Sequence, residues 1–151
     1  MRRVLLVLVS SLLFLPLAQA ADNGLITLKS PYSVDETLDR FEKAVTGKGM
    51  TVFARVDHAS GAASVDLELR PTQLLIFGNP KIGTLLMQSN QTAAIDLPLK
   101  LLAWKDAKGQ VWIAYNDPGY LVKRHAITDR DPVVAKMRKA LGNFAAAATK
   151  K

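Results

Sequence analysis

The residues best suited to binding an anion lie between two apolar runs, in the segment Phe77-Gly78-Asn79-Pro80-Lys81. Gly78 permits a sharp turn, and proline is favoured at the first position of a helix, so a helix is expected to start here. Free amides at a helix start can hold a carboxylate or phosphate, and the ammonium group of Lys81 would assist them. An ordinary capped helix is the simpler interpretation, because Pro80 supplies no amide and the pattern is not a Walker loop. The functional hypothesis is an anion site made by Gly78, Asn79 and Lys81.

Three further polar residues could form the rim of such a site. Asn116 and Asp117 follow an apolar run and precede a proline, and Asp96 precedes another apolar run. Polar groups at the ends of strands often serve in binding. An Asn-Asp-Pro sequence is also a common turn, which is the alternative for that segment. The sequence predicts Asp96, Asn116 and Asp117 as ligand contacts.

The chain holds two histidines, His58 and His125, and an imidazole can act as a general base or as a metal ligand. Asp57 precedes His58 in a predicted strand, where neighbouring side chains point to opposite faces, so Asp57 cannot easily orient His58. A metal site could combine the histidines with Asp57, Asp96 or Asp117, although the HExxH and His-x-His spacings are missing. Surface or hydrogen-bonded histidines are the simpler interpretation. The sequence therefore indicates no cofactor and no resident metal, and leaves both histidines as alternative candidates.

The first twenty residues have the layout of a secretory signal peptide. Residues 1–3 are basic at two positions, residues 4–17 are mostly apolar, and Ala18-Gln19-Ala20 fits the cleavage pattern, with Ala21 as the expected mature start. A retained membrane anchor is the alternative, but the apolar run is short for a full span. No cysteine stands near Ala20, so a lipid anchor is not expected. The sequence predicts export to the periplasm or medium, without stable membrane insertion after cleavage.

The chain contains no cysteine, which excludes disulfides, iron–sulfur clusters and zinc sites with cysteine ligands. Hydrophobic residues make up 49% of the sequence, which is enough for a core that needs no cross-links. The formal net charge is +7, and the basic excess lies mostly in the last third. A basic surface can bind nucleic acid or an anionic membrane, but export argues against nucleic acid, and a solvated helix face is the simpler interpretation.

The elements that must position these residues follow from periodicity and turn residues. Alternation predicts strands over residues 25–29, 50–57, 65–70, 72–77, 99–105 and 110–116, with 72–77 as the central strand and the last two joined in a hairpin. Helical spacing predicts helices over residues 34–46, 81–88, 120–125 and from 131 onward, with fraying from Ala145, and a helical turn over 59–66. No internal repeat or linker is present, so residues 21–151 are expected to form one domain.

Several segments together resemble one family. They are GLITLKSPYS at residues 24–33, GMTVFARVDH at 49–58, ELRPTQLLIFGNPKIG at 68–83, LMQ at 86–88, IDLP at 95–98 and VWIAYNDP at 111–118. In combination they are similar to the domain of unknown function 302. The resemblance implies an α+β fold with an antiparallel sheet of about four or five strands and helices on one face, similar to the TATA-binding-protein-like group. It also implies a homodimer and no assigned activity, and likeness to a DNA-binding fold does not imply DNA binding.

Three hypotheses remain open. The first is a periplasmic, dimeric binding module for a small anionic or polar ligand. The second is an enzyme that uses His58 as acid or base, or a metal site built from His58 and His125. The third is an envelope protein that binds a partner through basic residues of its last helix, which are Lys136, Arg138 and Lys139. Trp104 and Trp112 are expected to be core or dimer-surface aromatics.

Overall fold

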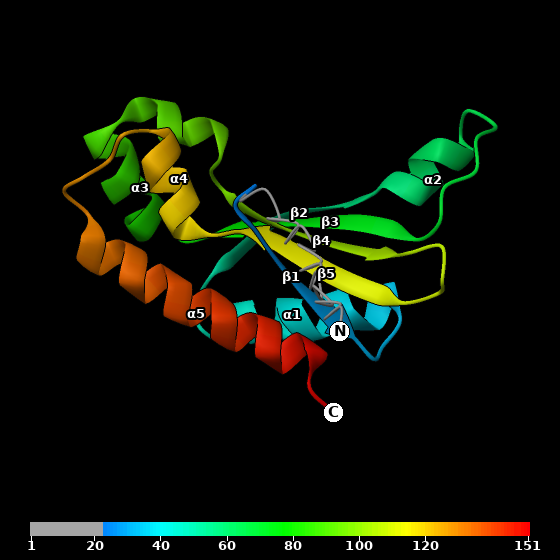
Figure 1. Cartoon of the computed structure of the whole chain (residues 1–151). Helices are drawn as coiled ribbons and strands as arrows, with labels where there is room; N and C mark the ends of the chain where they lie inside the picture. Colours follow the sequence, from blue (N-terminus) through cyan, green and yellow to red (C-terminus); the bar gives the residue numbers. More distant parts are fainter. Residues whose placement is uncertain (1–22) are drawn as a thin grey trace, which may run out of the picture.

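The computed structural model describes residues 23–151. At its centre is a five-stranded antiparallel sheet with the strand order β1-β5-β4-β3-β2. The strands are β1 (Leu25–Ser30), β2 (Thr51–Asp57), β3 (Thr72–Gly78), β4 (Leu99–Lys105) and β5 (Val111–Asn116). The helices are α1 (Val34–Thr46), α2 (His58–Ala63), α3 (Pro80–Ser89), the 3₁₀ helix η1 (Gln91–Ile95), α4 (Pro118–Arg124) and α5 (Asp131–Thr149). Figure 1 shows α3, η1 and α4 beyond one end of the sheet and α2 beyond the other.

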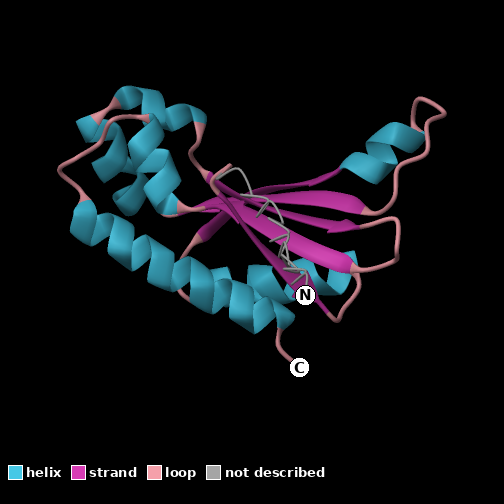
Figure 2. Ribbon diagram, in the orientation of Figure 1, coloured by secondary structure: helices cyan, strands magenta, loops and turns pink. Residues whose placement is uncertain are grey.

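The expected α+β architecture is confirmed. The long helices α1 and α5 lie side by side and cover one face of the sheet, as Figure 2 shows. The hydrophobic core lies between this face and the two helices, and Leu38, Phe41, Leu75, Leu101 and Ile113 in it are fully buried. Burial of this apolar area is the main force that holds the layers together.

Phe41 of α1 connects the two layers of the core. Its ring meets Phe77 of β3 edge to face, with centroids 5.0 Å apart, and meets Phe144 of α5 in the same way at 6.2 Å. The position of Phe41 follows from the helical spacing of Val34, Leu38 and Val45, which are buried with it. The predicted stripe of α1 is therefore confirmed, and so is its N-cap, because Ser33 accepts a hydrogen bond from the amide of Glu36.

The central strand is β4, whereas the sequence analysis assigns that place to residues 72–77. β3 is the second strand from the β2 edge, and β4 pairs with both β3 and β5. The misassignment has a physical reason. β3 and β4 are both inner strands with one fully buried face, so their sequences show similar apolar runs. Apolarity alone therefore does not tell which of the two lies at the centre of the sheet.

The predicted edge strand at residues 65–70 does not form. These residues leave the sheet after α2, and Val65, Leu67 and Leu69 are 63%, 65% and 48% exposed. Alternation of apolar residues does not make a strand unless a neighbour supplies its hydrogen bonds. The C-terminal helix, in contrast, continues through Ala145 to Thr149, where the sequence predicts fraying. Ala145 and Ala148 are fully buried, and their burial holds the last turns in place.

Among residues 23–151, no helix covers the inner strands on the second face of the sheet, and this face is largely apolar. Leu74, Leu102 and Ala114 are direct neighbours across β3, β4 and β5, and Trp104 stands opposite Trp112 with the rings stacked 6.5 Å apart. We refer to the side chains of the inner strands on this side as the open face; they are Thr72, Leu74, Ile76, Lys100, Leu102, Trp104, Trp112, Ala114 and Asn116.

The predicted signal peptide, residues 1–20, and the expected mature start at Ala21 lie outside the described residues. None of the helices described for residues 23–151 has the length and hydropathy needed to cross a bilayer.

Candidate functional site

A cavity of about 780 Å³ lies where the end of the sheet meets three helices. Its walls come from the C-terminal part of α1, the start of β2, the end of β3, the first turns of α3, the loop before β4 and one side of α5. A volume of this size falls in the range of about 300–1,000 Å³ that is typical of sites for one small molecule. Phe53, Thr84, Lys136 and Asn143 are exposed lining residues, so the cavity opens to solvent.

The lining is mainly apolar and contains three methionines, Met50, Met87 and Met137. Met50 directly precedes β2, Met87 lies in α3 and Met137 lies in α5. Phe144 and Leu141 of α5 complete the buried side of the wall. Methionine side chains are flexible and polarisable, and they adapt to ligands of irregular shape. The cavity therefore offers an adaptable apolar surface.

Five lining residues are polar: Lys48, Asn79, Thr84, Lys136 and Asn143. Lys48 follows α1, and Lys136 lies on α5. In the described part of the chain, neither lysine makes an ion pair or a side-chain hydrogen bond, and no aspartate or glutamate lines the cavity. The charge of the lining is thus positive.

The predicted anion site at the start of α3 is only partly open to a ligand. Gly78 and Asn79 line the cavity, whereas Lys81 does not. The side-chain oxygen of Asn79 accepts a hydrogen bond from the amide of Lys81 at 2.9 Å. The backbone carbonyl oxygen of Asn79 accepts hydrogen bonds from the amides of Ile82 and Gly83. Pro80 has no amide hydrogen. The amides that would hold an anion thus already donate hydrogen bonds within the first turn of α3. Their acceptor is Asn79, which the sequence predicts as a ligand contact.

Asp117 lies apart from this site and is engaged in two roles. It caps α4 by accepting the amide of Gly119, and it receives two hydrogen bonds from Arg138 of α5. The hydrogen bond from Arg138 holds the pKa of Asp117 below its ordinary value, and the same hydrogen bond, together with the charge of Asp117, raises the pKa of Arg138. Neither Asn116 nor Asp117 lines the cavity. The hydrogen bonds between Asp117 and Arg138 connect α4 to α5.

Asp96 and His125, which the sequence treats as separate candidates, meet in the structure. A hydrogen bond of 2.6 Å joins Nε2 of His125 to Oδ2 of Asp96, and another of 2.8 Å joins Nδ1 to the hydroxyl of Thr92. Arg124 donates to the other oxygen of Asp96. His125 is buried, and both of its ring nitrogens are engaged. The network holds η1 against the end of α4.

His58 lies in the exposed first turn of α2, far from His125, since α2 and α4 stand at opposite ends of the sheet (Figure 1). Asp57 caps α2 through the amide and hydroxyl of Ser60, and these hydrogen bonds lower the pKa of Asp57. Over residues 23–151 there is no group of three histidine, cysteine, aspartate or glutamate side chains that could hold a metal. The structure therefore does not bring the two histidines together.

Nothing in the sequence indicates that two lysines and three methionines share one cavity. Met50, Met87 and Met137 are separated by long stretches of chain: Met50 precedes β2, Met87 lies in α3 and Met137 lies in α5. Only the packing of α5 across the end of the sheet brings them together. Lys136 is one of the basic residues expected on a solvated helix face, and nothing in its sequence neighbourhood distinguishes it from Lys139.

Comparison with curated proteins finds relatives from Brucella. The chain is 48% identical over 112 residues to the fluoride-specific ion channel FluC 1 of Brucella suis biovar 1 (strain 1330), a match that covers 74% of this chain and 44% of that protein. The fluoride-specific ion channel FluC 2 of Brucella melitensis biotype 1 is also 48% identical over 112 residues, at 42% of its length. The chain thus spans less than half the length of the curated relatives that it matches.

A solved structure is similar in fold. The crystal structure of an uncharacterized conserved DUF302 protein from Bacillus stearothermophilus superposes with a TM-score of 0.75, covering 83% of this chain and 98% of that one, at 20% sequence identity. The model of the family described as domain of unknown function DUF302 matches residues 26–144. The sequence resemblance is therefore confirmed: the chain belongs to the DUF302 family.

Proposed function

We propose that this protein is an exported, homodimeric binding module that holds one small ligand in the cavity between α1, α3 and α5. The observation that carries the proposal is the cavity itself, which is large, apolar and open to solvent. A pre-formed apolar hollow with a few polar groups is the usual form of a small-molecule site. The three methionines support the same conclusion, since they allow one surface to fit ligands of different shape.

Binding is favoured over catalysis by the groups that the cavity presents. Its lining has no histidine and no carboxylate among the described residues, and Lys48 and Lys136 are its titratable groups. General acid–base catalysis needs a positioned proton donor or acceptor within hydrogen-bond reach of the substrate. His125 is buried in its own network away from the lining, and His58 is isolated on α2.

The proposed dimer uses the open face. Leu74, Leu102, Trp104, Trp112 and Ala114 form the apolar part of this face. Two charged side chains contact Trp112: the ammonium of Lys29 lies over its ring at 5.2 Å, and the carboxylate of Asp106 accepts a hydrogen bond from its Nε1 at 2.8 Å. An interface with two-fold symmetry needs one patch that is complementary to itself, and the apolar side chains of one sheet face can form such a patch. The cavity lies at the end of the sheet beside α5, so a partner on the open face would leave the ends of α1 and α5 uncovered.

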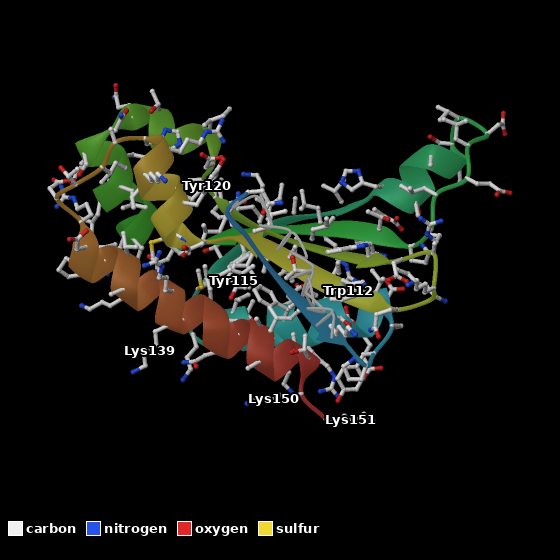
Figure 3. The ribbon with its side chains drawn as sticks, in the orientation of Figure 1. Trp112, Tyr115, Tyr120, Lys139, Lys150 and Lys151 are labelled. Carbon is white, nitrogen blue, oxygen red and sulfur yellow. The ribbon has the colours of Figure 1, made fainter. Side chains whose placement is uncertain are left out.

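The partner-binding alternative loses part of its basis in the structure. Of the three basic residues proposed as a handle, Lys136 lines the cavity and Arg138 is held by Asp117. Lys139 points away from the body of the protein, as Figure 3 shows. A continuous basic surface on α5 therefore does not form from these side chains.

The Brucella relatives are named as fluoride channels, which makes fluoride a second candidate ligand. Fluoride is small and strongly hydrated, and transferring an ion into an apolar space costs far more than it gains unless several donors surround it. The cavity has few donors, which come from Lys48, Asn79, Thr84, Lys136 and Asn143. A ligand with a substantial apolar part suits this lining better than fluoride does.

Two glycines provide a matched test of the cavity. Gly83 lies in α3 and lines the cavity, where an added side chain would contact Leu97 and Met87. Gly142 lies in α5, and an added Cβ meets nothing within 4 Å. Leucine is a better helix former than glycine, so both helices should tolerate the change. Gly83→Leu places a side chain in the cavity and narrows it, whereas Gly142→Leu leaves it open.

The measurement is the fluorescence titration of N-phenyl-1-naphthylamine, a neutral probe that becomes bright in apolar surroundings. We expect saturable binding to the native protein and to Gly142→Leu, and at least a tenfold loss of affinity in Gly83→Leu. Circular dichroism and thermal melting establish that both variants are folded. Equal binding by the two variants, or no binding by the native protein, would remove the cavity as the ligand site.

A further inference from the structure

We infer that the ligand is a single-chain amphipathic anion, with an alkyl tail in the cavity and a carboxylate or similar head group at its mouth. This inference rests on the proposed function and names the ligand class for the same site. Three features of the cavity lead to it: the position of the two lysines, the chemistry of the remaining wall and the size of the space.

Lys48 and Lys136 determine the charge of the head group. They come from different elements, lie on the same cavity and are exposed, so both ammonium groups can reach its mouth. No acidic side chain of the described lining neutralises them. Two unpaired cations beside an apolar space attract an anion, and the attraction is strengthened where water is partly excluded. A head group held at the mouth also stays hydrated, which avoids the cost of burying its charge.

The wall beyond the lysines determines the chemistry of the tail. Met137, Leu141 and Phe144 of α5 line the cavity, as do Ile82 and Met87 of α3. These side chains offer no hydrogen bond to a sugar, a nucleotide base or a peptide backbone. An alkyl chain gains from every methylene that it buries here, whereas a polar ligand would lose its hydration without replacement.

The size of the space limits the ligand to one chain. At about 30 Å³ for a water-sized group, a cavity of about 780 Å³ holds roughly two dozen such groups. A fatty acid of medium length fits within that space with its head group. A phospholipid with two long chains and a large head group exceeds it.

The test is displacement of N-phenyl-1-naphthylamine by octanoate, decanoate and dodecanoate, with the alcohols of the same chain lengths as neutral counterparts. All ligands are used below the concentrations at which they form micelles. We expect each pair of added methylenes to strengthen binding about tenfold until the cavity is full, in line with roughly three- to fourfold per methylene. We also expect decanoate to bind at least fivefold more tightly than decanol at low ionic strength.

Lysine variants establish the source of that preference. Lys48→Gln with Lys136→Gln should remove the preference for decanoate and leave decanol binding unchanged. Lys139→Gln also removes a positive charge from α5, but from a residue that does not line the cavity. It should leave the affinities for decanoate and decanol unchanged. A loss of the preference for decanoate in Lys139→Gln as large as that in the double variant would show that general surface charge attracts the anion, and would overturn the inference.

The two proposals fail in different ways. If Gly83→Leu blocks the binding of N-phenyl-1-naphthylamine but decanoate binds no better than decanol, the cavity remains a ligand site. The assignment of the ligand as an amphipathic anion is then wrong. If neither the naphthylamine nor any chain of the series binds, both proposals fail. Displacement by a two-chain phosphatidylglycerol as strong as that by dodecanoate would contradict the limit to one chain.

Discussion

Arg138 donates two hydrogen bonds to the carboxylate of Asp117, from Nε to Oδ1 and from Nη2 to Oδ2, and each is 2.7 Å long. The pair joins the N-cap of α4 to the middle of α5, and α5 forms one wall of the cavity. Gly119 stands beside it, and a side chain there would collide with the guanidinium group. This two-point contact fixes the position of α5 more firmly than a single hydrogen bond would.

Removal of the charge of Asp117 should lower stability in a pH-dependent way. Asp117→Asn keeps an oxygen that can cap α4 but weakens the contact with Arg138. We expect a loss of about 1 kcal/mol in the free energy of unfolding at pH 7, a modest value because the pair is partly exposed to solvent. Urea denaturation measures this difference, and Arg138→Met should give a similar loss, with little further effect in the double variant.

The pH dependence of this loss has a definite sign. Arg138 lowers the pKa of Asp117 in the folded protein below 3.8, so the folded state favours the ionised carboxylate. The stabilisation is complete above about pH 5, where Asp117 is ionised in both states, and disappears as the pH falls through the folded pKa. The difference between the native protein and Asp117→Asn should therefore shrink in acid. A constant difference down to pH 2 would contradict the assignment to charge.

The buried network around His125 should be structural. His125→Ala removes the partner of Asp96 and of Thr92, and we expect it to lower the free energy of unfolding by about 2 kcal/mol, because buried polar groups lose their hydrogen bonds. His58→Ala, at an exposed position, should change it by less than about 0.5 kcal/mol. Thermal or urea unfolding gives both values. Equal effects of the two substitutions would show that the network contributes no stability.

The open face should hold two copies together in solution. Leu102→Lys places a charge in the middle of that face, between Leu74 and Ala114, and we expect it to convert the dimer to a monomer without loss of fold. Val65→Lys also replaces an exposed apolar residue, but lies on the segment outside the sheet, and should leave the dimer intact. Light scattering coupled to size-exclusion chromatography gives the masses. A monomeric native protein, or a dimeric Leu102→Lys, would exclude this interface.

Export should be visible in the mass of the mature chain. When the full sequence is expressed in a bacterium with a Sec pathway, we expect the periplasmic fraction to contain protein that begins at Ala21. Intact-mass spectrometry and N-terminal sequencing test this directly. Replacement of Ala18 and Ala20 by bulky residues should block processing, since the cleavage site needs small side chains. Full-length protein confined to the cytosol of the native host would contradict it.

Much of the fold could be predicted because its signals are local. The Ser33 cap, the stripe of Leu38, Phe41 and Val45, and the hairpin of β4 and β5 each depend on residues close together in the chain. The order of β3 and β4 and the fate of residues 65–70 depend on which neighbours a segment finds in space, and periodicity does not contain that information. The sequence therefore predicts the type of most elements and misplaces those that need a tertiary partner.

The candidate site shows the same division. Gly78 and Asn79 are recognisable because they form a turn and a helix cap, and both line the cavity. Asp117 has the same local signal, yet its carboxylate is taken by Arg138, which lies 21 residues away in the sequence. The lysines and methionines of the cavity have no local signal, since only packing gives them a shared surface.

The most direct test uses the methionine methyl groups as reporters. The chain has four methionines, of which Met1 belongs to the predicted signal peptide and the other three line the cavity. Titration of decanoate into mature protein labelled with carbon-13 at the methionine methyls should shift the resonances of Met50, Met87 and Met137 together, with nuclear Overhauser effects to the alkyl chain. If decanoate binds while all three resonances stay unchanged, the ligand lies elsewhere and the cavity is not the functional site.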